Sequence, residues 1–284
     1  MINAFANFFA LVLLTIPALP VPAKAKPPMV RHVEVVGRDY TFEVPRELPP
    51  GPTAFHFSNR GSVRHEFNLA LLKEGVTLDQ YLKVLWEGKP VSPLLEGPVG
   101  VLFAGKGEES AADLVTNLKA GRNYVIICIF KDKPDAKRHH QLGMFSLIHI
   151  SGRRNIPDGS QKIDTIVGSD YAFMYPAALK PGRHTFAFVN NGKQRHELAF
   201  ALLKPGVSVA DVNEADKTGK SVKDLIEFSP GLLHSPAGKI PLGLLQVNLL
   251  PGREYMIECG FQDSDKSPPH YELGMFGSIK VARK

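Results

Sequence analysis

The sequence contains very little cysteine and tryptophan, with two Cys and one Trp among 284 residues. Two cysteines cannot build the multi-disulfide framework of a small secreted scaffold, and no Cys-x-x-Cys pair suggests a redox dithiol or a zinc knuckle. The sequence also has no glycine-rich phosphate-binding loop and no nucleophile elbow. These absences exclude several common enzyme classes before any residue is assigned a role.

Long apolar runs are scarce as well. The run at residues 8–16 is too short to span a bilayer, and prolines follow it closely. Together with the small residues that come next, this pattern is typical of a secretory signal peptide at 1–25, cleaved after Ala25. The sequence therefore predicts a periplasmic or secreted protein without a transmembrane segment in its mature chain.

Charge gives no sign of a nucleic-acid interface. The formal net charge is +6, but the basic residues are scattered and form no stripe interleaved with aromatic side chains. The composition, 44% hydrophobic and 22% charged, is that of a globular protein long enough for two domains. We expect no nucleic-acid partner.

The chain repeats itself. The stretch RHEFNLALLKEG (64–75) returns as RHELAFALLKPG (195–206), and NLKAGRNYVIICIF (117–130) returns as NLLPGREYMIECGF (248–261). A period of about 130 residues is that of a duplicated domain rather than of a short structural repeat. The copies therefore indicate two domains in tandem.

The domain boundary falls in residues 151–162, which are rich in Gly, Ser, Pro and charge, as linkers are. This places domain 1 at 26–152 and domain 2 at 153–284. Within each copy the pattern is mainly β, as in HTFAFVNNG (184–192), which alternates apolar and polar residues and then turns.

One segment in each copy breaks the β pattern. Residues 77–88 have helical apolar spacing, with Thr77 placed to cap the helix, and their counterpart lies around 207–228. The predicted fold is thus mainly β, with two tandem β-sandwich domains that each carry a partly helical insertion.

Four residues of metal-ligand type keep one offset between the copies, 131 residues (196 − 65 = 131). One thiolate, two imidazoles and a weak thioether form the trigonal site with a long axial methionine that suits copper in electron transfer. We expect the first histidine at a distant strand end, the cysteine at the end of a strand, the second histidine in the next loop, and the methionine at the start of the next strand. The four are His65, Cys128, His139 and Met144, which recur as His196, Cys259, His270 and Met275.

Each of these residues also has a structural interpretation, because cysteine and methionine often fill cores and histidine often caps a strand. The preserved order in both copies favours metal ligation. His140 competes with His139 as a ligand, but Tyr271 replaces it in the second copy, whereas His139 matches His270. We expect the two cysteines to stay unpaired, since they hold equivalent positions in separate domain cores.

The spacing Asn-Gly-x-x-x-His in NNGKQRHEL (190–198), followed far downstream by Cys and by His-x-x-x-x-Met, resembles the cupredoxins, or blue copper proteins. The resemblance covers roughly residues 30–150 and 160–281. It implies a Greek-key β-sandwich in each copy, with a type 1 copper near one end and a redox partner protein. Carried over to this sequence, it implies the copper ligands His65, Cys128, His139 and Met144, and then His196, Cys259, His270 and Met275.

Two-domain copper enzymes such as nitrite reductases and laccases need further histidines, in His-x-His pairs or beside the cysteine. Cys128 lies between two isoleucines, Cys259 lies between Glu258 and Gly260, and no His-x-His pair is present. We therefore expect a copper protein for electron transfer or copper handling that is not an enzyme. The alternative is a metal-free, cupredoxin-like binding or scaffold module.

Overall fold

The computed structural model describes residues 30–153, 155, 162–264 and 266–284. The predicted signal peptide (1–25) and most of the predicted linker (151–162) lie outside these residues. The described part of the chain contains no helix with the length and apolar character that a membrane span requires.

Strands dominate both halves of the chain, which confirms the prediction of a mainly β fold. The strands of the first half are β1 (Arg31–Arg38), β2 (Thr41–Glu43), β3 (Glu47–Leu48), β4 (Gly51–Asn59), β5 (His65–Leu72), β6 (Leu95–Ala104), β7 (Glu109–Leu118), β8 (Asn123–Ile127) and β9 (Phe145–Ile150). Those of the second half are β10 (Asp164–Ser169), β11 (Ala172–Met174), β12 (Ala178–Leu179), β13 (Gly182–Asn190), β14 (His196–Leu203), β15 (Ile226–Phe228), β16 (Gly231–Ser235), β17 (Gly243–Leu249), β18 (Glu254–Glu258) and β19 (Phe276–Val281).

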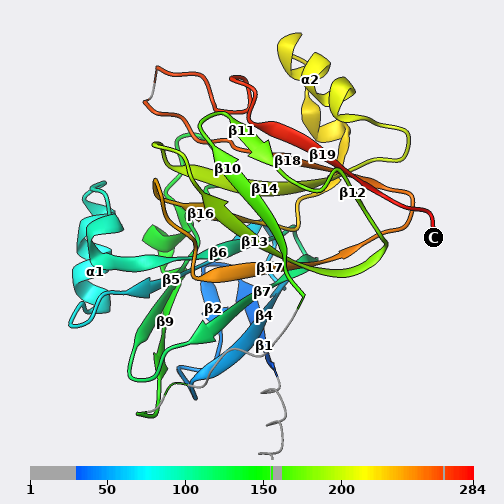
Figure 1. The fold of residues 1–284 in the computed structure, drawn as a ribbon. Helices are drawn as coiled ribbons and strands as arrows, with labels where there is room; N and C mark the ends of the chain where they lie inside the picture. Colours follow the sequence, from blue (N-terminus) through cyan, green and yellow to red (C-terminus); the bar gives the residue numbers. More distant parts are fainter. Residues whose placement is uncertain (1–29, 154, 156–161, 265) are drawn as a thin grey trace, which may run out of the picture.

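These strands form two sheets, and each sheet draws on both halves of the chain (Figure 1). One runs in the order β11-β10-β13-β17-β7-β4-β1-β2, and the other in the order β12-β19-β18-β14-β16-β6-β5-β8-β9-β3, with β15 paired to β14. The second half repeats the strand order of the first in both sheets. The halves join where β17 pairs with β7 and β16 with β6, both antiparallel.

The main hydrophobic core lies between the sheets and is shared by the two halves. Buried phenylalanines of both halves belong to one cluster, including Phe55 with Phe67 and Phe186 with Phe200, whose ring centroids lie 5.6 and 4.8 Å apart. The expectation of separate domain cores is therefore wrong. Because the sheets continue across the β7–β17 and β6–β16 pairs, their inner apolar faces are continuous too.

Glycine permits the close approach at this junction. A Cβ atom on Gly231 would lie 2.5 Å from the carbonyl oxygen of Val101, and one on Gly243 would lie 2.4 Å from that of Val99. Backbone atoms cannot retreat from such contacts without shifting a strand. Only a residue without a side chain fits there.

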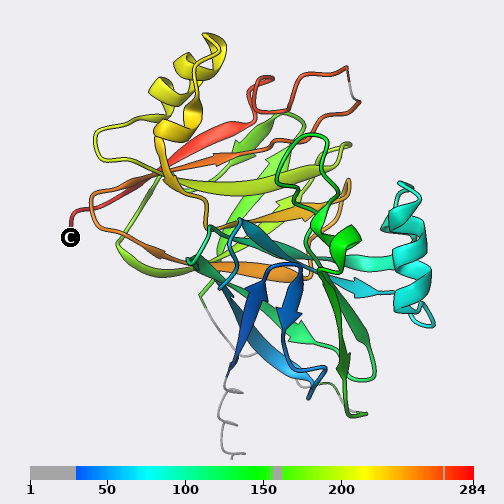
Figure 2. The same ribbon diagram turned by 180° about the vertical axis from the view of Figure 1, so that it is seen from behind.

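The two predicted helical insertions are present as α1 (Leu78–Trp86) and α2 (Val209–Lys217), at opposite sides of the molecule (Figure 2). Thr77 caps α1 as predicted, because its hydroxyl accepts from the Gln80 amide in a capping box. The buried face of α1 carries Tyr81 and Leu82, in a second apolar cluster with residues of β5 and β8. Short 3₁₀ turns complete the fold at Ser92–Leu94, His139–Leu142 and Val222–Asp224.

Candidate metal centre

The structure places each candidate ligand where the sequence pattern predicts. In the first half, His65 opens β5, Cys128 directly follows β8, His139 opens a 3₁₀ turn in the next loop, and Met144 directly precedes β9. In the second half, His196 opens β14, Cys259 follows β18, His270 lies in the loop, and Met275 precedes β19. β5 pairs with β8, and β14 with β18, which brings the first histidine of each half beside the cysteine.

In the first half the three side chains meet in one buried group. Nδ1 of His65 lies 3.0 Å from Nδ1 of His139, which lies 3.4 Å from Sγ of Cys128. All three side chains are fully buried, and their ligand atoms lie within 4.8 Å of one another. The group combines residues 74 positions apart in the chain.

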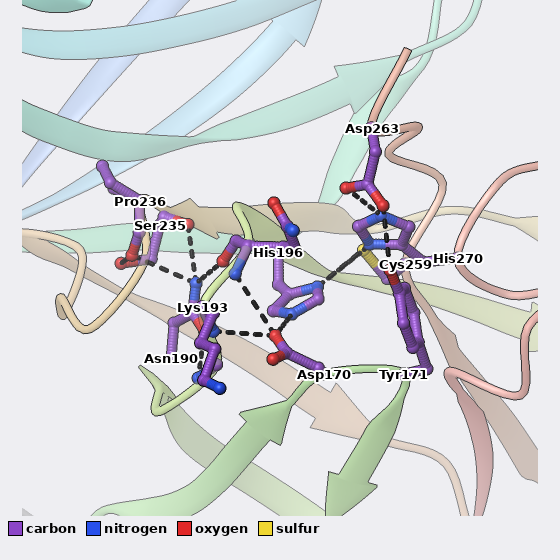
Figure 3. A network of polar contacts seen from close by, with 12 residues as sticks. Asp170, Tyr171, Asn190, Lys193, His196, Ser235, Pro236, Cys259, Asp263 and His270 are labelled. Carbon is purple, nitrogen blue, oxygen red and sulfur yellow. Dashed lines mark hydrogen bonds and ion pairs between the residues drawn. The ribbon is translucent and has the colours of Figure 1, made fainter. Parts of the chain in front are cut away.

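The second half repeats this geometry, as Figure 3 shows. Nδ1 of His196 lies 3.0 Å from Nδ1 of His270. Sγ of Cys259 lies 3.8 Å from the first of these nitrogens and 3.4 Å from the second. Metal–nitrogen distances of about 2.0–2.1 Å and metal–sulfur distances of about 2.3 Å let two ligand atoms of one ion stand at such separations. The donor set therefore fits a single ion in each half.

Both methionines lie next to these groups. Met144 and Met275 are fully buried, and their carbonyl oxygens accept from the amides of Cys128 and Cys259 at 3.1 and 3.0 Å. Met144 also donates its amide proton to the carbonyl oxygen of His139 at 3.0 Å. The backbone therefore fixes each methionine beside the cysteine and the second histidine.

The outer nitrogen of every imidazole faces a carboxylate. Nε2 of His65 lies 3.3 Å from Asp39, and Nε2 of His139 lies 3.1 Å from Asp132. The matching distances in the second half are 3.2 Å from His196 to Asp170 and 3.0 Å from His270 to Asp263. A carboxylate beside Nε2 favours the tautomer that carries its proton there, and in that tautomer Nδ1 keeps its lone pair.

Two lone pairs 3.0 Å apart repel each other unless a proton or a metal ion lies between them. Burial lowers the pKa of His65 and of His196, which disfavours a proton. Burial also raises the pKa of both Cys128 and Cys259 to about 12, so each carries a thiol proton in the metal-free protein. Burial therefore favours the neutral forms of the first histidine and the cysteine in each group, which a bound cation would complete.

A glutamate beside each site orders the cysteine loop. The amide of Glu66 donates to Sγ of Cys128 at 3.4 Å, and that of Glu197 donates to Sγ of Cys259 at 3.3 Å. The Glu66 carboxylate accepts from the amide of Ile129 at 2.9 Å, just beyond the cysteine. Burial raises the pKa of Glu66 to about 7. Each glutamate therefore ties the first histidine's strand to the backbone around the sulfur.

A tyrosine in an unusual backbone conformation covers each site. Tyr40 and Tyr171 both have φ of 66°, in the left-handed region that aromatic residues rarely occupy. The Tyr40 ring meets that of His139 edge-on at 5.1 Å, and its hydroxyl donates to Asp132 at 3.2 Å. Tyr171 does the same with His270, at 5.1 Å, and with Asp263, at 2.8 Å. Such conformations cost about 1–3 kcal/mol and concentrate at functional sites.

The turn before each first histidine is held by an asparagine. Nδ2 of Asn59 donates to three carbonyl oxygens, those of Val63, Ala104 and Gly105, and its Oδ1 accepts from the Gly61 amide. Asn190 makes the equivalent bonds in the second half (Figure 3). These bonds fix the loop from which His65 and His196 enter the site.

The remaining histidines lie outside the two groups. His140 is buried next to His139, yet within the described residues neither of its ring nitrogens has a hydrogen-bond partner. His139, not His140, contacts Cys128. His56 and His184 form pairs with Asp113 and Asp164, away from both cysteines. The structure thus favours His139 over its neighbour as the candidate ligand.

The sequence-based prediction missed the aspartates and the tyrosines. They keep the same offset as the ligands: Asp39, Tyr40 and Asp132 recur at 170, 171 and 263 (170 − 39 = 131). Because the Asp-Tyr doublet occurs at equivalent positions in both copies, the sequence could have marked these residues as candidates. What it could not indicate was contact with the imidazoles, because Asp39 lies 26 residues from His65 in the chain.

Comparison with known proteins finds no matching family model and no matching curated protein. Among solved structures, the chain is similar to a dithionite-reduced auracyanin from Roseiflexus castenholzii, with 19% identity over 44% of this chain and 99% of that one, and a TM-score of 0.28. It is also similar to a multicopper oxidase, with 12% identity over 89% of both chains and a TM-score of 0.25. A copper-containing nitrite reductase from Thermus scotoductus SA-01 matches at 10% identity over 90% of this chain and 63% of that one, with a TM-score of 0.25.

At these TM-scores the overlays do not decide the fold, which the strands and sites of the chain itself define. The two sheets and the buried His-Cys-His groups are what the sequence resemblance to the cupredoxins predicts. This chain carries its His-Cys-His group twice, 131 residues apart (259 − 128 = 131).

Proposed function

We propose that the chain is an exported copper-binding protein with one type 1-like site in each half, and that it transfers electrons or handles copper. The proposed ligands are His65, Cys128, His139 and Met144, and their counterparts His196, Cys259, His270 and Met275. One observation carries the proposal: in both halves two buried imidazole nitrogens with free lone pairs face each other at 3.0 Å beside a cysteine sulfur. A shared cation relieves that contact and keeps both Nε2–H···carboxylate bonds of the site, whereas moving a proton to one Nδ1 breaks one of them.

The repeated strand order supports a duplicated unit. We propose that residues 26–152 and 153–284 are two cupredoxin-like Greek-key domains whose sheets have fused at the β7–β17 and β6–β16 pairs. Each unit then carries its own site, with the cysteine strand and the first histidine's strand side by side. Cleavage after Ala25 would leave both units in the exported chain.

The roles of the protein groups follow from their positions. Bound copper would supply one-electron redox chemistry. The Cys128 sulfur and the imidazoles of His65 and His139 supply soft and borderline donors that hold both oxidation states. Their anchoring to strand ends and to a hydrogen-bonded loop keeps the donors in one arrangement, which limits reorganisation when an electron is transferred. The amide of Glu66 donates to the sulfur and stabilises its thiolate form.

We favour electron transfer or copper handling over oxidase or nitrite reductase chemistry. Those enzymes need a second copper centre with additional histidines. The residues next to Cys128 and Cys259 in the sequence are not histidines. Within the described residues, the groups of ligand-type side chains able to hold a metal are the two His-Cys-His sets.

The test is copper analysis with a visible spectrum on the purified full chain. We expect two copper ions per wild-type chain, an intense thiolate-to-copper absorption band, and one ion in each single variant, Cys128→Ser or Cys259→Ser. His149→Gln is the matched control, because His149 is exposed and bonds to Asn123 away from both sites. A chain that binds no copper, or that keeps two ions and its spectrum without the cysteines, would instead support the metal-free scaffold.

A further inference from the structure

We infer that the aspartates behind the imidazoles, Asp39 and Asp132 with their counterparts Asp170 and Asp263, set the oxidation-state preference of the two copper sites in favour of Cu(II). The inference rests on the proposed copper function and concerns side chains that act through the histidines, as positioning and charge-supplying groups. Each site is thereby a low-potential centre compared with the same ligands lacking the aspartates.

Each of the four candidate-ligand imidazoles has a carboxylate partner. The side chains of all four histidines are 1% exposed or less, and those of the four aspartates that hold them are 30–41% exposed. The Nε2–H groups consequently point at carboxylates rather than at water or at backbone carbonyl groups. This arrangement, a carboxylate behind a histidine in front of a metal, orients the ring and makes it a stronger donor.

A stronger donor stabilises the more highly charged ion. If an external reductant gave one electron to bound Cu(II), which would become Cu(I), the positive charge facing the two imidazoles would fall by one. Both Nε2 protons stay in place and no protein bond is broken. The two negative carboxylates of a site therefore lose more interaction free energy than neutral acceptors would. Reduction becomes less favourable.

The two aspartates of a site do not contribute equally. Asp39 also accepts from the amide and the hydroxyl of Ser62, both at 2.7 Å, and lies 3.3 Å from His65. Asp132 lies closer to its histidine, at 3.1 Å, and accepts otherwise from the Tyr40 hydroxyl at 3.2 Å. Its charge is directed more fully at the imidazole. Removing the charge of Asp132 should therefore shift the midpoint potential more than removing that of Asp39.

Substitution of the tyrosine should shift the midpoint potential in the direction opposite to substitution of the aspartate. The tyrosine hydroxyl draws carboxylate charge away from the histidine, so Tyr40→Phe should strengthen the pull of Asp132 and lower the potential. Asp132→Asn should raise it, because asparagine can still accept from Nε2 but carries no charge. A merely structural role would move both variants in one direction. Tyr171, with its shorter 2.8 Å bond to Asp263, should show the larger tyrosine effect.

The experiment is a redox titration with mediators, followed by the visible band, on the copper-loaded full chain carrying Cys259→Ser so that only the first site reports. Asp132→Asn should cut Cu(II) affinity about 10- to 100-fold. Each tenfold fall in Cu(II) affinity relative to Cu(I) raises the midpoint potential by about 59 mV. Asp132→Glu, which keeps the negative charge, should raise the midpoint potential less than Asp132→Asn does. Asp135→Asn, exposed in the same loop, is the charge control.

The outcomes separate the inference from the function on which it rests. A wild-type chain that binds no copper overturns both the proposed function and this inference. Normal copper binding with potentials that Asp132→Asn leaves unchanged, or shifts no more than Asp135→Asn does, overturns the inference alone. If Cys259→Ser does not fold, Asp132→Asn and Asp263→Asn in the two-site chain should each displace half of the titrated signal, and an undivided titration curve contradicts the inference equally.

Discussion

Metal binding should release one proton per site from the cysteine. Burial raises the pKa of Cys128 and Cys259 to about 12, while burial lowers the pKa of His65 and His196, so these histidines are neutral above pH 7. Burial raises the pKa of Glu66 to about 7, so at pH 8 and above this group has already ionised. Between pH 8 and 10 each thiol must therefore lose its proton before the sulfur can bind a metal ion as a thiolate.

The magnitude follows from the gap between the thiol pKa and the working pH. At pH 8 about one thiol in 10⁴ is ionised, which weakens the apparent metal affinity by about 5 kcal/mol relative to a preformed thiolate. The affinity should rise about tenfold for each pH unit between 8 and 10. Two protons should leave for each chain that fills both sites.

The assay is calorimetric titration of the full chain with Zn²⁺, a redox-silent probe of the same donors, in buffers of different ionisation enthalpy. Cys128→Ser should halve both the metal bound and the protons released. Binding that releases no protons, or an affinity that stays flat from pH 8 to 10, would refute the assignment of the thiols as ligands.

Three further predictions concern the fold around the sites. Gly243→Ala places a Cβ against the Val99 carbonyl oxygen, 2.4 Å away, and should lower the unfolding free energy by about 1–3 kcal/mol in urea titrations; an unchanged midpoint would contradict the tight junction. Thr77→Ala removes the N-cap of α1 and should lower the unfolding free energy by about 1 kcal/mol in the same assay, and an unchanged urea midpoint would contradict the capping contact. In the metal-free protein, folding raises the pKa of Glu66 from 4.5 to about 7, so the folded state binds its proton more tightly and stability falls as pH rises through this window, by about 3 kcal/mol at most. Glu66→Gln should remove that fall, and an identical pH profile in variant and wild type would count against it.

The sequence predicted the parts of the site that depend on local pattern. The offset of 131 residues (196 − 65 = 131) identified the candidate ligands, and apolar alternation with turn residues placed them at strand ends. The helix at 77–88 followed from its capping residue and apolar spacing. These signals lie within a few residues of each other, so they can be recognised without knowing the tertiary structure.

What the sequence could not supply was long-range pairing. Pairing of β16 with β6 and of β17 with β7 joins segments that lie far apart in the chain. The close approach of Gly231 and Gly243 to the backbone of β6 is equally invisible in the sequence. The contact of Asp132 with His139 requires the path of the loop between them, and that of Asp39 with His65 requires the turn after β1. A duplicated sequence led us to expect a separate hydrophobic core in each half. Because both sheets continue from one half into the other, the two halves share one main core instead.

The central claim, that one sulfur and two imidazole nitrogens of each half hold the same ion, is tested most directly by X-ray absorption at the copper edge of the loaded full chain. We expect one sulfur at about 2.3 Å or slightly less and two nitrogens at about 2.0 Å for every copper. A spectrum with nitrogen and oxygen neighbours but no short copper–sulfur distance would contradict it.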